Sequence, residues 1–428
     1  MAEPGDRVKA MTNDGSFEGI LMPGSNNSVF IKLDSGYNIG IDSKKISSLK
    51  VLGIAMKKKG EVKQVKKKNN LPSIAILHTG GTIASKVDYR TGGVSAGYSA
   101  EEFLEMFPGL SEIANIETKA VLNIMSEDIC FADYVKLANA IEEFSGKCDG
   151  IIIGHGTDTL SYTSAALAFM FEKINIPVIL VGSQRSSDRG SSDSAMNVQS
   201  AARFIASSDF AGIAICMHSS SNDDQCAIFS PLKTRKMHTS RRDAFKAIND
   251  TPIALVDSFG KMDFIKKDYS RKSNEKTILK PGFEKDVCLL KTHPNMSQDI
   301  FDFCTKRYKA IVIEGTGLGH APVNISNNQK NYEALKSYIK KGGIVAVTSQ
   351  CIYGRVHPSV YSNLRRLSEI GCIFCEDMLP ETAFIKAAWL LGNYKPAEAA
   401  GLLAANLRGE ITERSLYEKD FLEYSYKN

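Results

Sequence analysis

Two short stretches of the chain place hydroxyl groups and glycines directly after apolar runs. The first is TGGT, Thr79–Thr82, after the apolar run 74–77, and the second is HGTDT, His155–Thr159, after the apolar run 151–153. A short apolar run that ends in a glycine turn predicts a buried strand. Open α/β sheets bind ligands beyond the carboxyl ends of such strands. A hydroxyl held there beside glycine N–H groups has the components of a nucleophile and its oxyanion hole.

A threonine hydroxyl is a weak nucleophile and needs a base or a hydrogen-bonding partner. A lysine can serve when burial or a carboxylate adjusts its ammonium group. The basic stretch KTRKMHTSRR, 233–242, offers more than one lysine, and composition alone does not choose between them. His155 lies between two glycines and is the less favoured catalytic group.

Other chemistries lack their motifs. A serine triad, a zinc hydrolase and a phosphate-binding loop are not expected, and the chain contains no HExxH and no GxxxxGK[ST]. The CxxC at Cys372–Cys375 lies in an apolar run and supplies only two of the four ligands of a structural zinc. We therefore predict packing at this pair and no metal site.

From Ser73 onward, strand and helix patterns alternate, which predicts α/β architecture with mostly parallel sheets. The expected strands are 74–78, 150–153, 176–182 and 211–217, then 287–291, 310–313 and 344–348. The expected helices are 131–145, 160–172 and 193–206, then 297–307, 328–341 and 358–369, with a largely helical region over 380–428.

Residues 7 to about 50 show a different pattern. Short alternating apolar runs are separated by clusters of Gly, Asn, Asp and Ser, which predicts a small antiparallel barrel. Seven lysines between Lys57 and Lys68 indicate a solvated linker. The predicted domains are a β-barrel at 1–56, a linker at 57–72, an α/β domain at 73–265, a connection at 266–283 and a second α/β domain with a helical tail at 284–428.

Composition points to a soluble cytoplasmic protein. The 428 residues carry a net charge of +5 and are 43% hydrophobic. The first residues do not have the pattern of a secretory signal, and no apolar run has the length of a membrane span. Nine cysteines, an odd number, are expected to be reduced thiols in the cytoplasm, and no membrane partner is expected.

Together, TGGTIA at 79–84 and HGTDT at 155–159 resemble the two signatures of the L-asparaginase family of threonine amidohydrolases. The resemblance covers about residues 73–390 and implies an asparaginase-like pair of α/β domains. With the added barrel and linker, the run Tyr89–Val94 and the stretch 233–250, the chain more closely resembles one branch of this family, the D subunits of archaeal glutamyl-tRNA(Gln) amidotransferases.

The resemblance implies a role for each catalytic residue. Thr82 matches the nucleophilic threonine, and Thr157 matches the second threonine of the family. Lys236 matches the lysine that tunes Thr157. Asp158 matches the aspartate that orients this lysine and binds the substrate α-ammonium group.

The resemblance also implies substrate-binding residues. Tyr89 matches a lid tyrosine that polarises the nucleophile, and Ser126 matches a serine that binds the α-carboxylate. Glu127 stands where many asparaginases have glutamine and is expected beside the α-amino group. The glycine-rich turns at Gly81 and Gly156 can donate N–H groups to the oxyanion.

The implied function is release of ammonia from glutamine or asparagine. The ammonia would pass to a kinase/transamidase partner, the E subunit of such complexes, that converts Glu-tRNA(Gln) to Gln-tRNA(Gln). The resemblance assigns no cofactor to this chain and places ATP and Mg²⁺ in the partner. It implies a homodimer within a heterotetramer, a site completed across the dimer interface, and tRNA(Gln) contact through the complex. The glycine-rich strand end Glu314–His320 is either structural or faces the neighbour's site.

Two alternatives stay open. One is a free-standing cytoplasmic L-asparaginase, against which the N-terminal barrel counts. The other is an inactive asparaginase-like RNA-binding protein, against which the complete set Thr82, Thr157, Asp158 and Lys236 counts.

Overall fold

The structure is a computed structural model of the 428-residue chain. It describes all residues except 1, 14, 26, 35–37, 54–67, 81–84, 88–93, 97–102, 105, 186–191, 325–327 and 416–428.

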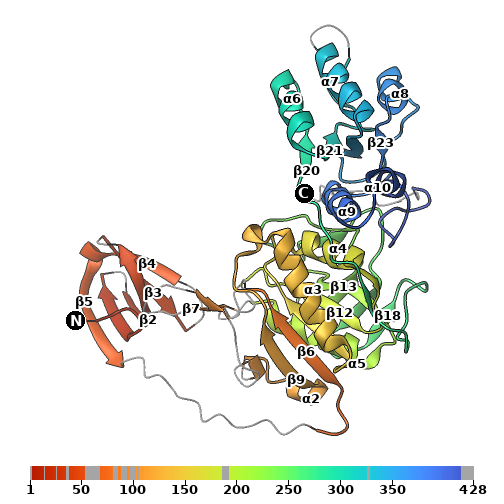
Figure 1. The fold of residues 1–428 in the computed structure, drawn as a ribbon. Coiled ribbons are helices and arrows are strands. Elements are labelled where there is room, and N and C mark those ends of the chain that lie inside the picture. The colour runs from red at the N-terminus through yellow and green to blue at the C-terminus, as the bar shows by residue number, and fades with distance from the viewer. Residues whose placement is uncertain are drawn as a thin grey trace, which may run out of the picture.

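The N-terminal region is a small all-β unit, shown in red in Figure 1. Its strands are β1 (Arg7–Thr12), β2 (Gly15–Ser25), β3 (Ser28–Leu33), β4 (Asn38–Asp42) and β5 (Ile46–Gly53). They form one antiparallel sheet in the order β4-β3-β2-β1-β5 around a core of five buried side chains: Val8, Ala10, Leu21, Ile31 and Ile41. The antiparallel all-β fold that the alternating runs predict for this region is confirmed.

The central unit is built on an eight-stranded mixed sheet. Its strands are β6 (Ser73–His78), β9 (Asn115–Ala120), β10 (Gly150–Gly154), β12 (Pro177–Val181), β13 (Gly212–His218), β14 (Gln225–Phe229), β17 (Ala254–Asp257) and β18 (Met262–Phe264). The order is β18-β17-β14-β13-β12-β10-β6-β9, and the five strands from β9 to β13 are parallel. Gly154 is in register with His78 on one side and with Val181 on the other. The carboxyl ends of three neighbouring strands therefore lie at one edge of the sheet.

Helices cover both faces of this sheet, so its central strands are buried throughout. Along β6, Ala75 and Leu77 join the core on the side of α3 (Phe131–Ser145) and α4 (Leu160–Met170). Ile74 and Ile76 join the opposite core, with α2 (Leu110–Ile113) and α5 (Ser194–Ser207). This alternation follows from the two-residue period of a strand.

The C-terminal unit is a four-stranded parallel sheet with helices on both faces (Figure 1). Its strands are β20 (Val287–Lys291), β21 (Ala310–Gly315), β22 (Ile344–Ser349) and β23 (Ile373–Phe374). Its helices are α6 (Gln298–Arg307), α7 (Gln329–Lys340) and α8 (Ser362–Glu369) on one face, and α9 (Pro380–Asn393) and α10 (Pro396–Leu403) on the other. Helix α9 packs on α4 of the central unit, with the rings of Phe169 and Trp389 stacked at 5.6 Å. One hydrophobic core therefore runs through both units.

Three small antiparallel pairs complete the described strands. They are β7 (Ser85–Val87) with β8 (Val94–Ala96), β11 (Phe171–Lys173) with β19 (Ile278–Leu279), and β15 (Thr234–Lys236) with β16 (Phe245–Ala247).

Two details differ from the sequence prediction. Helix α4 ends at Met170 rather than at residue 172, because the chain from Phe171 pairs as β11 with β19. The described chain after α10 is not helical. Instead, the carboxylate of Glu410 accepts hydrogen bonds from the N–H groups of Leu407 and Arg408 and holds a turn there.

The predicted packing role of the CxxC is supported, because Cys372 and Cys375 flank β23 and are buried. Within the described ranges, no group of three or more His, Cys, Asp or Glu side chains could hold a metal ion. No helix of the described chain is long and apolar enough to cross a membrane.

Candidate active site

The turn after β6 is fastened to the end of β10. The N–H and the hydroxyl of Thr79 both donate to the carbonyl of Gly154, over 3.1 and 3.0 Å. Gly80 has φ +104°, and a Cβ there would lie 2.5 Å from the carbonyl oxygen of Ile124, so this position requires glycine. The first motif therefore begins at the same sheet edge as the second.

The continuation of the first motif lies outside the described residues. Three of the predicted site residues fall there: Gly81, Thr82 and Tyr89. Their roles stay predictions.

The second motif meets Lys236 at this edge. Thr157 and Asp158 lie in the loop between β10 and α4, and Lys236 is the last residue of β15. The Lys236 Nζ donates to Thr157 Oγ1 over 2.9 Å and lies 2.6 Å from Asp158 Oδ1. The Lys236 side chain is 15% exposed, whereas that of Asp158 is 67% exposed. One ammonium group thus joins a hydroxyl and an accessible carboxylate.

The structure distinguishes the lysines of the basic stretch. Lys233 is buried and pairs with Asp377, so it does not face the loop after β10. Lys246, on the partner strand β16, lies 3.6 Å from Asp243. Lys236 is the residue of this hairpin whose ammonium reaches Thr157.

Ser126 lies beneath the same loop. A Cβ on Gly156 would come within 2.8 Å of Ser126 Oγ, and the Thr159 hydroxyl donates to the Ser126 carbonyl over 2.6 Å. Ser126 is only 4% exposed, while its neighbour Glu127, in the same 3-10 turn, is exposed. The structure therefore brings Ser126 and Gly156 into contact and leaves Glu127 open to solvent at their side.

His155 has a structural environment. Its Nδ1 donates to the carbonyl of Gly156 over 2.7 Å, so the ring Nε2 accepts from the Thr163 hydroxyl over 2.8 Å. Burial lowers the pKa of His155 to about 4. This neutral ring fastens the loop to α4, in agreement with its low rank as a catalytic candidate.

A third strand end contributes to the site and is absent from the sequence prediction. A Cβ on Gly182, after β12, would lie 2.6 Å from Thr157 Cγ2, so glycine leaves room for the threonine. The residues after Gly182 are held by the buried carboxylate of Asp193. This carboxylate accepts hydrogen bonds from Ser183 Oγ and from the N–H groups of Gln184 and Arg185. The sequence VILVGSQR, an apolar run that ends in glycine, is the pattern from which this loop could have been predicted as part of the site.

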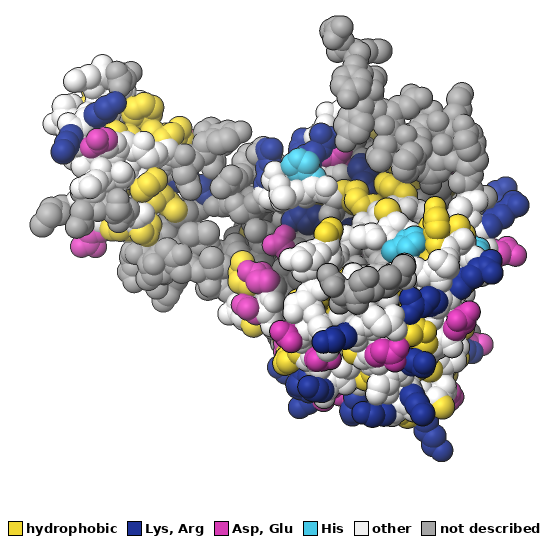
Figure 2. Space-filling view, turned by 90° about the horizontal axis from the view of Figure 1, so that it is seen from above, with side chains coloured by type: hydrophobic (Ala, Val, Ile, Leu, Met, Phe, Trp, Pro, Cys, Tyr) yellow, Lys and Arg dark blue, Asp and Glu magenta, His cyan; other side chains and the backbone are white. Residues whose placement is uncertain are grey.

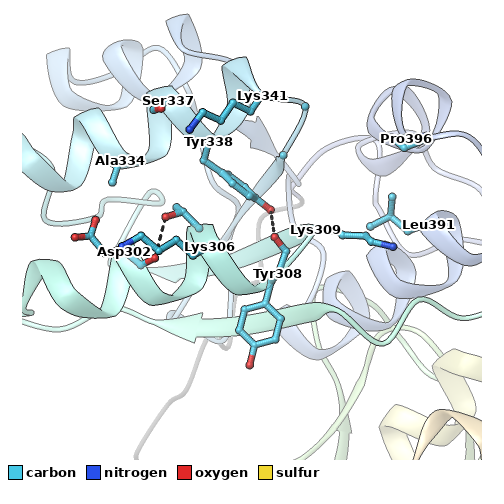
Figure 3. A pocket seen from close by; sticks show the side chains of 13 residues that line it. Asp302, Lys306, Tyr308, Lys309, Ala334, Ser337, Tyr338, Lys341, Leu391 and Pro396 are labelled. Atoms are coloured by element: carbon cyan, nitrogen blue, oxygen red, sulfur yellow. Dashed lines mark hydrogen bonds between the residues drawn. The ribbon is translucent and has the colours of Figure 1, made fainter.

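A separate cavity of about 470 Å³ lies in the C-terminal unit, near the ends of α6 and α7 (Figure 3). Its lining contains Lys306, Lys309 and Lys341 but none of the residues predicted for the site. In Figure 3 the side chain of Lys309 extends away from those of Lys306 and Lys341, and Lys309 also binds Glu284. This cavity thus does not gather its charges toward one ligand.

The side chains at the β10 edge suit a small ligand that carries an ammonium group. Because Thr157 Oγ1 accepts this hydrogen bond from Lys236, its own hydroxyl proton can be donated to another group, such as a ligand. The exposed carboxylate of Asp158 can bind a ligand ammonium group while it retains Lys236.

Comparison with family models gives three matches. Residues 2–52 match the GatD N-terminal domain, residues 73–269 match the N-terminal asparaginase domain, and residues 286–401 match the glutaminase/asparaginase C-terminal domain.

Relatives match almost the whole chain. The D subunit of glutamyl-tRNA(Gln) amidotransferase from Pyrococcus furiosus is 45% identical over 424 residues, which cover 96% of this chain and 95% of the relative. The protein of the same name from Methanococcus maripaludis is 42% identical over 417 residues, with 96% and 98% covered.

Solved structures of L-asparaginases match most of the chain. The thermostable L-asparaginase from Thermococcus kodakarensis superimposes with a TM-score of 0.70 at 32% identity and covers 80% of this chain and 100% of its own. L-asparaginase I from Vibrio cholerae gives a TM-score of 0.68 at 26% identity, with 80% and 99% covered. The asparaginase-like fold expected from the two motifs is confirmed.

Proposed function

Because the chain belongs to the family of glutamyl-tRNA(Gln) amidotransferase D subunits, we propose that its active site hydrolyses the side-chain amide of glutamine or asparagine to supply ammonia. The observation that carries this proposal is the contact of Lys236 Nζ with both Thr157 Oγ1 and Asp158 Oδ1. These side chains come from two separate segments, and the resemblance to the amidohydrolase family implies a role for each.

Thr82 is the nucleophile in this mechanism. Its Oγ attacks the amide carbon while its proton passes to the amide nitrogen, the C–N bond breaks, and ammonia leaves. Water then attacks the acyl-threonine ester, which releases the amino acid and restores the hydroxyl. Thr157, oriented by Lys236, is placed to relay protons, and N–H groups near Gly81 and Gly156 stabilise the oxyanion.

The remaining predicted residues hold the substrate. Asp158 binds the α-ammonium group with the help of Glu127, and both carboxylates are exposed. Ser126 binds the α-carboxylate, and its burial beneath Gly156 fixes where that group can approach. Tyr89 polarises Thr82 from a lid.

The ammonia serves a second reaction in a partner chain. The partner, a kinase/transamidase that forms the E subunit of the complex, activates glutamate on tRNA(Gln) and amidates it. ATP and Mg²⁺ act in that partner, this chain carries no cofactor, and tRNA(Gln) is bound through the complex. The chain is a homodimer within a cytoplasmic heterotetramer.

Neither alternative has comparable support. A free-standing asparaginase does not account for the match of residues 2–52 to the GatD N-terminal domain. An inactive RNA-binding protein does not account for the joined Thr157, Asp158 and Lys236. On the face in Figure 2, the described Lys and Arg side chains are interspersed with Asp and Glu rather than gathered into one basic patch.

The proposal is tested by ammonia release from glutamine and from asparagine, with the chain alone and with its partner and charged tRNA. Thr82→Ala and Lys236→Ala are each expected to reduce release by at least about 100-fold, since each removes a group required in the transition state. Lys246→Ala is the matched control, because Lys246 is on the same hairpin and is bound to Asp243. Release at the normal rate by Thr82→Ala would exclude Thr82 as the nucleophile.

A further inference from the structure

Lys236 lies on β15, a strand that forms no hydrogen-bonded pair with the eight-stranded sheet. Strands β15 and β16 are three residues each, and among the described strands they pair only with each other. The hairpin includes the hydrogen bonds from Met237 N to the Ala244 carbonyl and from Ile248 N to the Lys233 carbonyl. Its position relative to Thr157 therefore depends on the burial of Phe245 in the main core and on contacts at the ends of the hairpin.

The entry to the hairpin is fixed by a buried ion pair with the C-terminal unit. Lys233 Nζ lies 2.6 Å from Asp377 Oδ2, and both side chains are 1% exposed. Lys233 is three residues before Lys236, and Asp377 lies between β23 and α9. This contact thus joins the strand that carries Lys236 to the second α/β unit.

Further contacts from the same unit hold the hairpin at both ends. The Thr382 hydroxyl donates to the Leu232 carbonyl over 2.9 Å. At the exit, the side chain of Asn249 exchanges two hydrogen bonds with the backbone of Gly354, over 3.1 and 2.9 Å. Between them, Arg235 Nε lies 3.5 Å from the carboxylate of Glu381.

Asp377 is itself oriented by the chain beyond α10. The N–H of Thr412 donates to Asp377 Oδ1 over 2.9 Å, and the Thr412 hydroxyl donates to Oδ2. Arg355 in turn donates to the carbonyl of Thr412 over 3.0 Å. The carboxylate that receives Lys233 has therefore little freedom to rotate.

Because the Lys233–Asp377 pair is buried, its main effect is to fix the position of the chain rather than to increase the free energy of unfolding. Removing two charges from water carries a large desolvation cost, so a buried ion pair contributes little beyond what apolar residues of the same volume would contribute. Burial lowers the pKa of Lys233, and the Asp377 carboxylate opposes this shift. What the pair supplies is a fixed direction and register for the strand that follows.

We propose that Lys233 and Asp377, with Thr412 behind them, are positioning residues for amide hydrolysis. The C-terminal unit holds β15 through this pair so that Lys236 Nζ stays within hydrogen-bond distance of Thr157 and Asp158. The inference rests on the proposed function of Lys236. It adds that the catalytic lysine of the central unit is set in place from the C-terminal unit.

The test replaces the pair by neutral groups of similar shape, Lys233→Met with Asp377→Asn. The matched control is Lys386→Met with Glu410→Gln, a second pair that is also separated by 2.6 Å and 0% exposed. Its hydrogen bonds go to the backbone of residues 405–408, away from the hairpin. Both variants of the full chain are assayed with the partner chain for kcat and KM toward glutamine, and their thermal unfolding is measured.

The Lys233/Asp377 variant is expected to lose about 10- to 100-fold in kcat with KM changed by less than about threefold, because a small displacement of a catalytic group is costly in the transition state. The control is expected to keep kcat within about threefold. Thr412→Val, which removes one hydrogen bond and no charge, is expected to lower kcat by about two- to fivefold and answers the question even if the pair variant unfolds.

Wild-type kcat in a folded Lys233/Asp377 variant, an equal loss in the control, or no effect of Thr412→Val would each overturn the inference. Lys236→Ala is measured alongside. Full activity in Lys236→Ala would overturn the proposed function instead, so the two failures are distinguishable.

Discussion

The turns after β10 and after β21 begin in the same way and differ in what reaches them. Each follows a buried central strand and combines glycine with threonine, as Gly154–Thr157 and as Gly315–Thr316. The second turn closes on itself, because Thr316 and His320 exchange backbone hydrogen bonds of 2.9 and 2.8 Å. The first turn receives Lys236 from the β15–β16 hairpin. The two turns thus share glycine and threonine, and the first differs in the lysine that a separate segment brings to its threonine.

The sharpest test of this comparison replaces each threonine with its isostere. Thr157→Val is expected to reduce kcat for ammonia release by about 100- to 1000-fold, since it removes the hydroxyl bound to Lys236 but keeps the methyl group beside Gly182. Thr316→Val is expected to stay within about twofold. A large loss in Thr316→Val would show instead that the second turn faces an active site, such as that of a neighbouring chain.

The buried histidine of the first turn predicts a pH dependence of stability. Its pKa is about 4 when folded and about 6.5 when unfolded, so the unfolded chain binds the proton first as the pH falls. The contribution of neutral, buried His155 to the free energy of unfolding is complete above pH 6.5. As the pH falls from 6.5 to 4, the free energy of unfolding decreases by about 3 kcal/mol on account of this residue.

The contribution of His155 is measured by urea unfolding of the wild type and of His155→Gln at pH 7 and pH 4.5. The variant is expected to lose less stability than the wild type over this interval. Equal losses in both proteins would assign the pH dependence to other groups, among them His78, whose pKa is also lowered by burial.

Alanine at one glycine of each turn should separate activity from stability. A Cβ at Gly156 would press on Ser126 in the substrate site, so Gly156→Ala is expected to reduce kcat/KM by about tenfold with a higher KM. A Cβ at Gly319 would lie 2.7 Å from Val347 Cγ1, and its φ is +105°, so Gly319→Ala is expected to lower the unfolding free energy by about 1–3 kcal/mol.

Steady-state kinetics and chemical unfolding of both variants check this division. Unchanged kinetics in Gly156→Ala, or a kinetic defect without loss of stability in Gly319→Ala, would contradict it.

The smallest effect is expected at the cysteines of the C-terminal unit. Burial raises the pKa of Cys372 and of Cys375 to about 12, so both thiols stay protonated and shielded at neutral pH. Maleimide treatment of the native protein at pH 7 is expected to label the exposed Cys130 and Cys351 and to leave the CxxC unlabelled. Peptide mass spectrometry gives the pattern, and rapid labelling of Cys372 would contradict the packing role.

The central parallel strands were predictable because each is a continuous apolar run closed by glycine or a polar cluster. The added strands were not, since β9 has the mixed sequence NIETKA and β17 is only four residues long. Such strands form because the neighbouring strand offers an unpaired edge, which is a property of the assembled sheet.

The site was predictable to the extent that family motifs carry it. HGTDT marks the loop, but Lys236 is 79 positions from Thr157, and the residues of the basic stretch alone do not single it out. What separates Lys236 from Lys233 is burial against Asp377, which is 144 positions away in the chain. Contacts between residues so far apart in the sequence arise from packing between the two α/β units, and no local sequence pattern indicates them.

The packing of α4 against α9 has a consequence for synthesis of the chain. Ten of the eleven residues of α4 are buried, and part of that surface is covered by α9, which begins about 210 residues later. At translation rates of 5–20 residues per second, roughly 10 to 40 s separate the emergence of the two helices from the ribosome. During that interval the apolar surface around Phe169 has no Trp389 to cover it. The nascent central unit therefore exposes this apolar surface, which favours aggregation, until the C-terminal helices are made.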